Sequence, residues 1–226
     1  MAKFARSAAL GISVLAALTF AALAAAGAAG APSDLEDYVQ ALESSYHDVR
    51  TLRAEFTQTY TWGARTRVES GTVNFARGGL MRWDYREPAP KLFLATGKEV
   101  YLYIPSENQV TRSSVKSSED LRVPFRLLLS RLDLRKVFAR IEFADGALEV
   151  APGDRVLRAV PKHGEETYRE VLMEVTPNLD IRRLVVSYAD RSRMEFDFNR
   201  IERNVALDPA LFRFTPPQGA EVIKQP

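Results

Sequence analysis

The sequence predicts a mainly β protein with a few helices (α+β), built as an incomplete antiparallel β-barrel of about ten or eleven strands. Three observations support this fold class. Apolar residues alternate with polar ones through most of the chain, short turn sequences separate these segments, and two segments repeat their apolar residues at helical spacing. Because amphipathic helices need an apolar surface to cover, we expect them to lie over the concave face of the curled sheet.

Residues 1–28 are typical of an export signal. A basic head precedes an apolar run rich in alanine, and Ala26 and Ala28 form an A-x-A cleavage site. The run is long enough for an uncleaved membrane anchor, which takes about 20 apolar residues, so that alternative stays open. Its alanine and glycine content partitions weakly into lipid and favours cleavage near Ala28. We therefore expect residues 29–226 to form a single exported domain.

Charge and cysteine usage exclude several classes of protein. The chain has 31 Lys and Arg against 29 Asp and Glu, and the export signal contains two of the basic residues, Lys3 and Arg6. The exported part is therefore formally neutral, and nothing in it favours nucleic acid as a partner. The chain has no cysteine, which excludes disulfides, thiolate metal sites, a cysteine nucleophile and acylation of its own N-terminal cysteine.

The exported part is predicted to open with a helix. Ser33-Asp34-Leu35-Glu36 is a capping box, in which Ser33 and Glu36 satisfy the free amides of a helix start. The apolar residues that follow are spaced three or four apart and share one face of the helix: Leu35, Val39, Leu42, Tyr46 and Val49.

From Leu52 onward the apolar period changes to two, which is typical of strands with one buried face. The alternating segments are 52–56, 73–75, 81–85, 100–104, 141–143, 148–150, 171–175, 184–188 and 194–198. Turn sequences such as Gly78-Gly79, Thr96-Gly97 and Pro177-Asn178 separate them. Connections this short cannot contain a parallel crossover, so neighbouring strands are expected to pair antiparallel.

One central segment interrupts the strand pattern. Ser117-Ser118-Glu119-Asp120 leads into a leucine-rich stretch, and a second apolar stretch runs from Leu132 to Phe138. We expect one or two short helices here. The regular part begins near Pro124, because proline is tolerated at the start of a helix but not inside it.

Catalytic motifs are lacking in the sequence. Its two histidines, His47 and His163, have no neighbouring ligands at metal spacing, so we interpret them as surface residues and expect no metal site. There is no G-x-S-x-G elbow, no P-loop and no G-x-G-x-x-G turn. We therefore expect no cofactor and no enzymatic activity.

Several blocks, taken together in their order and spacing, resemble the LolA family of lipoprotein carriers over nearly the whole exported part. The blocks are Phe56-Thr57-Gln58, Gly71-x6-Gly78-Gly79-Leu80-Met81-Arg82-Trp83-x-Tyr85-x2-Pro88, Thr96-Gly97-x3-Tyr101-x-Tyr103-x-Pro105-x3-Gln109-Val110, Val123-Pro124-Phe125 with Leu127-Leu128-Leu129, and Phe212-x-Phe214-Thr215-Pro216-Pro217-Gln218-Gly219. By this resemblance the fourth block is the central helix and the last is the closing strand.

The resemblance implies a half-barrel in the periplasm whose hollow is lidded by helices. Such a carrier takes acylated lipoproteins from an inner-membrane ABC transporter and delivers them to an outer-membrane receptor. The receptor of the family, LolB, has a similar fold but is itself a lipoprotein, so the absence of cysteine favours the carrier. A monomer without cofactor is expected.

The resemblance also assigns residues. It places the family's barrel-face arginine at Arg77, where it would act as a latch and hold the lid closed through hydrogen bonds to backbone carbonyls. A solvated charge at a strand end is the alternative, and the sequence departs from the family in Gly78, in place of proline, and Met81, in place of an aromatic residue. The lipid-binding candidates are Phe56, Phe75, Met81, Trp83 and Tyr85 of the strands and Phe125 and Leu128 of the lid.

Other interpretations stay open at this point. Periodicity does not distinguish a lipid-lined hollow from a closed core, which would contain the same aromatic residues, among them Phe196 and Phe198. A carrier of another amphiphile, such as a glycolipid or free lipid, a lipid sensor and an enzyme are the functional alternatives to lipoprotein carriage. A sensor usually has a second domain, and the sequence indicates only one.

Overall fold

The computed structural model describes residues 34–115, 132–162 and 168–225, and most of them lie in strands. The first six strands are β1 (Thr51–Trp62), β2 (Arg65–Ala76), β3 (Leu80–Glu87), β4 (Lys91–Thr96), β5 (Glu99–Ile104) and β6 (Gln109–Ser114). The next six are β7 (Phe138–Phe143), β8 (Arg155–Pro161), β9 (Tyr168–Val175), β10 (Ile181–Tyr188), β11 (Arg193–Arg203) and β12 (Glu221–Lys224). The helical elements among the described residues are α1 (Leu35–His47), α3 (Leu134–Val137) and the 3-10 turns η1 (Pro105–Glu107) and η2 (Pro209–Phe212).

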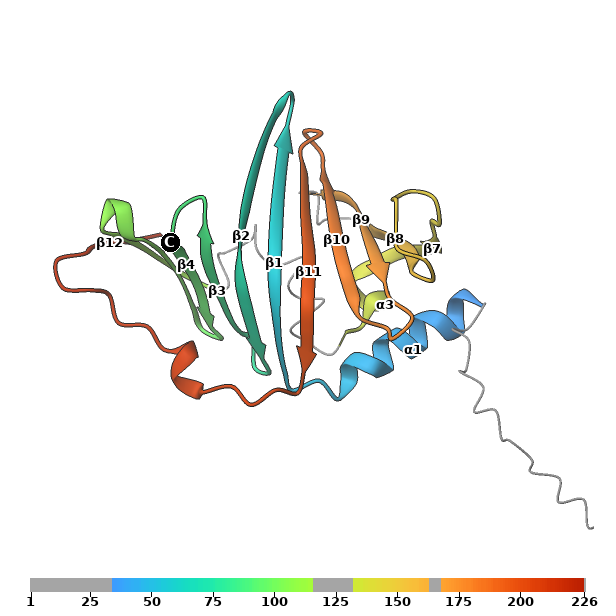
Figure 1. Ribbon diagram of the computed structural model, residues 1–226, viewed down its shortest axis with the longest axis horizontal. Coiled ribbons are helices and arrows are strands. Elements are labelled where there is room, and N and C mark those ends of the chain that lie inside the picture. Colours follow the sequence, from blue (N-terminus) through green and yellow to red (C-terminus); the bar gives the residue numbers. More distant parts are fainter. Residues whose placement is uncertain (1–33, 116–131, 163–167, 226) are drawn as a thin grey trace, which may run out of the picture. The chain divides into compact units, whose positions relative to one another are not determined.

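The strands form one curved, unclosed sheet in the order β12-β6-β5-β4-β3-β2-β1-β11-β10-β9-β8-β7 (Figure 1). β12 and β7 stand at the two ends of this order and are not paired with each other. Strands that follow one another from β1 to β6 and from β7 to β11 pair antiparallel, as the short turns predict. The predicted mainly β class and the incomplete barrel are confirmed.

One face of the sheet, here called the inner face, holds the main hydrophobic core. Pairing of β1 with β2 sets Leu52 opposite Phe75 and Phe56 opposite Gly71, so the apolar residues of the two strands point to the same side. The apolar stripe of α1 packs against this side, and Val39 and Leu42 are completely buried. A helix therefore covers part of the inner face, as the sequence predicts.

The C-terminal segment corrects two expectations. Within the described residues the sheet has twelve strands rather than ten or eleven, and β12 pairs parallel with β6, so the sheet is mixed. The block from Phe212 to Gly219 is not a closing strand: it contains the end of η2 and irregular chain, and Phe212 packs with Leu92 and Leu94 on the outer face. Prolines within this block cannot donate ladder hydrogen bonds, and the long connection from β11 allows a parallel partner.

The predicted strand at 148–150 is also wrong. These residues lie in a loop whose apolar side chains pack on the outer face of the sheet, and the strand at this place in the chain is β8. Leu148 and Val150 contact the cluster formed by Val156, Leu172 and Val185. A loop that packs its alternate side chains on a sheet has the same apolar period as a strand, which is why the pattern misled the prediction.

The helix ends differ slightly from expectation. Asp34, not Ser33, is the N-cap of α1, and its carboxylate accepts a hydrogen bond of 2.8 Å from the amide of Glu36. Ser33 lies outside the described residues. The second apolar stretch of the central segment forms only the single turn α3, after which β7 begins at Phe138. The amide of Leu134 donates to Glu43 Oε1 at 2.7 Å and ties α3 to α1.

Several predicted features fall outside the described residues. These are the export signal at 1–28, the leucine-rich part of the central segment with Phe125 and Leu128, and His163. Among the residues that are described, no helix is long and apolar enough to cross a membrane. His47 ends α1, and its Nδ1 lies 3.1 Å from Asp48 Oδ1.

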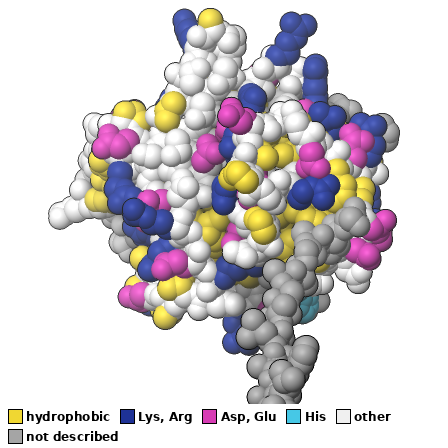
Figure 2. Space-filling model, turned by 45° about the vertical axis from the view of Figure 1, so that its right-hand side comes forward, with side chains coloured by type: hydrophobic (Ala, Val, Ile, Leu, Met, Phe, Trp, Pro, Cys, Tyr) yellow, Lys and Arg dark blue, Asp and Glu magenta, His cyan; other side chains and the backbone are white. Residues whose placement is uncertain are grey.

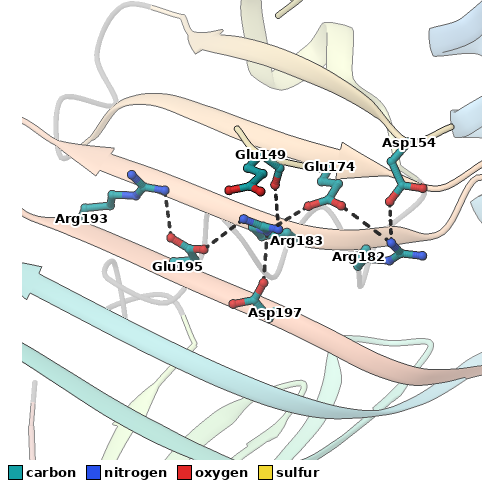
Figure 3. A network of polar contacts seen from close by, with 8 residues as sticks. All are labelled: Glu149, Asp154, Glu174, Arg182, Arg183, Arg193, Glu195 and Asp197. Atoms are coloured by element: carbon teal, nitrogen blue, oxygen red, sulfur yellow. Dashed lines mark hydrogen bonds and ion pairs between the residues drawn. The ribbon is translucent and has the colours of Figure 1, made fainter. Parts of the chain in front are cut away.

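The outer face of β9, β10 and β11 carries a network of ion pairs around Arg183 (Figure 3). The Nε of Arg183 lies 2.9 Å from Glu174 and 3.1 Å from Asp197, and a second nitrogen donates to the carbonyl of Glu149 at 3.2 Å. Burial raises the pKa of Glu174. Charges and a packed loop thus occupy this part of the outer face.

Candidate functional site

The aromatic candidates from the sequence gather on the inner face around Trp83. Trp83 is 1% exposed, and its ring centroid lies 4.7 Å from that of Phe56 and 5.6 Å from that of Phe75, both edge-on. Tyr85 meets Phe56 edge-on at 4.9 Å. Edge-to-face contacts of this kind are the arrangement that ring quadrupoles favour. Four of the lipid-binding candidates, which come from three strands, therefore form one cluster.

Two residues of β11 complete this cluster. The rings of Phe196 and Phe198 lie 5.7 Å and 6.2 Å from Trp83 and are nearly parallel to each other. We call this set the Trp83 cluster and define it as Phe56, Phe75, Trp83, Tyr85, Phe196 and Phe198. The candidate Met81 is buried in the same core, two residues before Trp83 in β3 and on the same face. From the sequence, Phe196 and Phe198 are candidates for a closed core. In the structure their rings pack against Trp83, one of the lipid-binding candidates.

Gly71 allows side chains of β1 and β3 to meet above β2. It lies opposite Phe56 on β1 and Tyr85 on β3, at a point where the pairing of β2 with β3 is irregular. A Cβ at this position would lie 2.0 Å from the carbonyl oxygen of Asp84, which is far inside van der Waals contact. Without a side chain on Gly71, the rings of Phe56 and Tyr85 can meet above the strand.

A group of polar side chains borders the Trp83 cluster on the same face. Glu69 is 5% exposed, and its carboxylate accepts hydrogen bonds from Lys91 at 2.7 Å and from Arg67 at 2.6 Å. The hydroxyl of Tyr85 donates to Gln58 Oε1 at 2.7 Å. We call Gln58, Arg67, Glu69 and Lys91 the Glu69 group. Sequence reasoning missed it, because an alternating pattern gives no sign that a charged residue is buried.

Electrostatics in the Glu69 group follow from burial. Desolvation lowers the pKa of Lys91, while its hydrogen bond to Glu69 acts in the opposite direction. The Lys91 ammonium also lies 4.1 Å from the centre of the Tyr85 ring, in cation–π contact. Burial raises the pKa of Tyr85, so its hydroxyl stays protonated and remains a donor at neutral pH.

Arg77 follows directly after β2 and reaches the C-terminal end of α1. Its Nε donates to the carbonyl of Val49 at 3.1 Å, and a terminal nitrogen donates to the carbonyl of His47. These carbonyls belong to the last turn of a helix and the residues after it, where backbone acceptors lack helical partners. Bonding to backbone carbonyls is the arrangement expected of the latch, and the latch role itself stays a prediction.

A second arginine holds the same end of α1 and was not predicted. The Nε of Arg203 lies 2.7 Å from Asp180 Oδ1, and its guanidinium stacks 4.4 Å from the centre of the Tyr46 ring. It also donates to the carbonyl of Ser45 at 3.3 Å. The amide of Ile181 donates to the Tyr46 hydroxyl at 2.9 Å. No local motif marks Arg203, because its partners are distant in sequence.

The surface chemistry is mixed in sign. In the view of Figure 2, Lys and Arg side chains are interspersed with Asp and Glu, without a broad field of one charge. Within residues 34–115, 132–162 and 168–225, no group of three or more His, Asp or Glu residues is arranged to hold a metal ion. The feature that distinguishes the inner face is the set of aromatic rings around Trp83.

Comparisons with known proteins give the same assignment as the sequence blocks. Residues 47–215 match the family described as "Outer membrane lipoprotein carrier protein LolA". The outer-membrane lipoprotein carrier protein of Dechloromonas aromatica is 31% identical over 216 residues, which covers 93% of this chain and 95% of that protein. The corresponding protein of Leptothrix cholodnii is 32% identical over 223 residues, which covers 98% of this chain and 99% of that protein.

Solved structures support the fold. The structure of an uncharacterized conserved protein from Thermus thermophilus has a TM-score of 0.51 at 14% sequence identity, covering 82% of this chain and 98% of that chain. Identity this low speaks for the fold alone. The family match and the full-length relatives settle the membership: the chain belongs to the LolA family of outer-membrane lipoprotein carrier proteins.

Proposed function

We propose that this chain carries lipoproteins through the periplasm with their acyl chains held against the Trp83 cluster. The observation that carries the proposal is the collection of aromatic side chains and Met81 on one face of an unclosed sheet. Family membership supports the cargo, since the relatives are outer-membrane lipoprotein carriers over nearly their full length. The Glu69 group limits the apolar region on one side.

The energetics of the cargo explain why such a face is needed. Each buried methylene contributes roughly 0.8 kcal/mol, so an acyl chain exposed to water is strongly unfavourable. A carrier must nevertheless release its cargo. Broad aromatic faces and the flexible thioether of Met81 give adaptable contacts without close shape complementarity, which keeps the bound state from becoming a trap.

We further propose the partners and the route. The chain is exported by the signal at residues 1–28, receives lipoproteins from an inner-membrane ABC transporter, and passes them to a LolB-like receptor in the outer membrane. It works as a monomer. The single domain at 29–226 is sufficient for these steps, and Arg77 is the latch whose hydrogen bonds favour the closed state.

A pair of variants on opposite faces of the sheet tests the binding site. Met81 and Leu92 are 8% and 9% exposed and lie on adjacent strands, but Met81 belongs to the inner-face core and Leu92 to the outer-face cluster. Each is replaced by glutamine, and folding is checked by circular dichroism. We expect Met81→Gln to lose most of the acylated protein that co-purifies from the periplasm and Leu92→Gln to retain it.

Mass spectrometry of the bound material tests the cargo class. Acylated peptides on the wild-type protein are the expected result. Wild-type protein that contains only free lipid or glycolipid would contradict lipoprotein carriage. Equal loss of cargo in Met81→Gln and Leu92→Gln, with both variants folded, would contradict binding at the inner face.

A further inference from the structure

The inner face changes from apolar to polar along the direction of β1. Leu52 and Phe56 are buried, Gln58 is half-buried and polar, and the strand continues to Tyr60 and Trp62, whose rings stack at 4.9 Å. Because side chains two apart share a face, all five point to the same side of β1. The apolar surface therefore ends at Gln58 and gives way to amphipathic rings.

The neighbouring strand shows the same change. On β2, Phe75 is buried in the Trp83 cluster, Glu69 is buried in ion pairs, and Arg67 is exposed. Register sets Glu69 opposite Gln58 and Arg67 opposite Tyr60, so these residues form a band across both strands. A buried carboxylate is unfavourable unless it is paired, and here two cations lie within 2.7 Å of it.

The two ends of this face differ in their contact with solvent. At the Phe75 end, Arg77 and Arg203 fasten the end of α1, and Tyr46 is buried against the core. At the other end, the β1–β2 hairpin reaches beyond its neighbours (Figure 1), and the pairing of β3 with β2 stops at Ser70. Polar and exposed side chains therefore lie where the inner face meets water.

We infer that a bound lipoprotein lies along β1 and β2 with its acyl chains toward Phe75 and its ester and amide carbonyls at the Glu69 group. Its polypeptide then leaves past Tyr60 and Trp62 at the hairpin. This orientation rests on the proposed function of the inner face. Arg67 and Lys91 supply donors for carbonyl oxygens, and the amphipathic rings of Tyr60 and Trp62 suit the boundary between lipid and water.

The reverse orientation conflicts with the same residues. It would place methylene chains over the charged Glu69 group and remove water from Arg67, whose side chain is 59% exposed. It would also place the carbonyls beside Phe75 and Met81, which have no hydrogen-bond donors in their side chains. The polypeptide would then have to leave past the end of α1, where two arginines fasten the backbone.

Site-specific crosslinking tests the orientation. The photoreactive residue p-benzoylphenylalanine replaces either Tyr60 or Phe75 in the full exported protein, which is loaded with a purified triacylated lipoprotein and irradiated. Mass spectrometry then locates the adduct on the cargo. We expect adducts from position 60 on the polypeptide or glyceryl group and adducts from position 75 on the acyl chains.

The outcomes separate the two proposals. Adducts on acyl chains from position 60, or on polypeptide from position 75, would overturn the orientation while leaving carriage intact. If neither the wild type nor the two photoreactive forms takes up lipoprotein, the proposed function itself is overturned, and the orientation with it.

A variant that preserves the core gives an independent test. Arg67→Gln removes an exposed donor of the Glu69 group, and Arg86→Gln removes an exposed arginine at the same end of the sheet for which no ion pair is found in the described residues. Arg67→Gln loses one hydrogen bond to the cargo, which contributes about 1 kcal/mol. We therefore expect this variant to release loaded lipoprotein about 5-fold faster than the wild type. Equal release rates in the two variants would contradict the proposal.

Discussion

Replacement of Arg77 by leucine should shift the carrier toward its open state. The substitution removes the side-chain hydrogen bonds to the carbonyls of His47 and Val49 but leaves the main-chain bond of 3.0 Å from Arg77 to Arg50. A bond from a charged donor contributes about 1.5–3 kcal/mol when shielded and less at an exposed site. We take about 1–2 kcal/mol for the pair, which corresponds to a shift of about 5- to 30-fold.

Two measurements check this shift. Hydrogen exchange at the end of α1 should become faster in Arg77→Leu, and the variant should still accept cargo but deliver less of it to receptor-bearing membranes. Arg77→Lys retains the charge but loses the forked donors, so we expect an intermediate result. Arg86→Leu is the control for loss of an exposed arginine. Wild-type delivery and wild-type exchange in Arg77→Leu would refute the latch.

Three further predictions concern stability. Trp83→Ala should lower the free energy of unfolding in urea by about 3–5 kcal/mol, because it empties the centre of the Trp83 cluster, and a loss below 1 kcal/mol would contradict its central place. Gly71→Ala should cost about 1–3 kcal/mol or more by the same assay, since the added Cβ collides with a backbone carbonyl; wild-type stability would disprove that contact. Hydrogen bonds from Ser192 hold the pKa of Asp190 below its ordinary value. A carboxylate of this kind stabilises the fold above its unfolded pKa of about 3.9 and loses that contribution as pH falls through the folded pKa. Ser192→Ala removes the hydroxyl donor but keeps the backbone amide that also donates to Asp190. An NMR titration should therefore show the low pKa in wild type and a higher one in Ser192→Ala, and equal values would contradict the assignment.

Much of the sheet could be predicted from the sequence because burial on one face imposes a period of two. The segment Met81-x-Trp83-x-Tyr85 is the clearest example, and it lies in β3 with the predicted side chains on one face. The period does not report what covers the opposite face. Leu148 and Val150 alternate because their loop packs on the outer face, and the parallel pairing of β12 depends on a long connection that has no local signal.

Only part of the site could be predicted from the sequence. Large aromatic residues at alternate positions identified four members of the Trp83 cluster, since such residues dominate any buried face. The Glu69 group could not be identified, because its three ion-pairing members come from β2 and β4 and meet only through the register of β3 between them. Arg203 was missed for the same reason: its contacts lie near positions 45 and 180.

The two arginines at the end of α1 differ in how firmly they hold it, and the difference bears on the opening movement. Arg203 is 21% exposed and combines an ion pair of 2.7 Å to Asp180 with stacking on Tyr46. Arg77 is exposed, and the contacts its side chain makes within the described part of the chain are with backbone carbonyls. Breaking the Arg203 contacts would leave a partly buried charge without its partner, which costs far more than returning Arg77 to water. If Arg77 is the latch, its release therefore frees the carbonyls of His47 and Val49 from the start of the β2–β3 turn, while Arg203 keeps the end of α1 fastened beside β10.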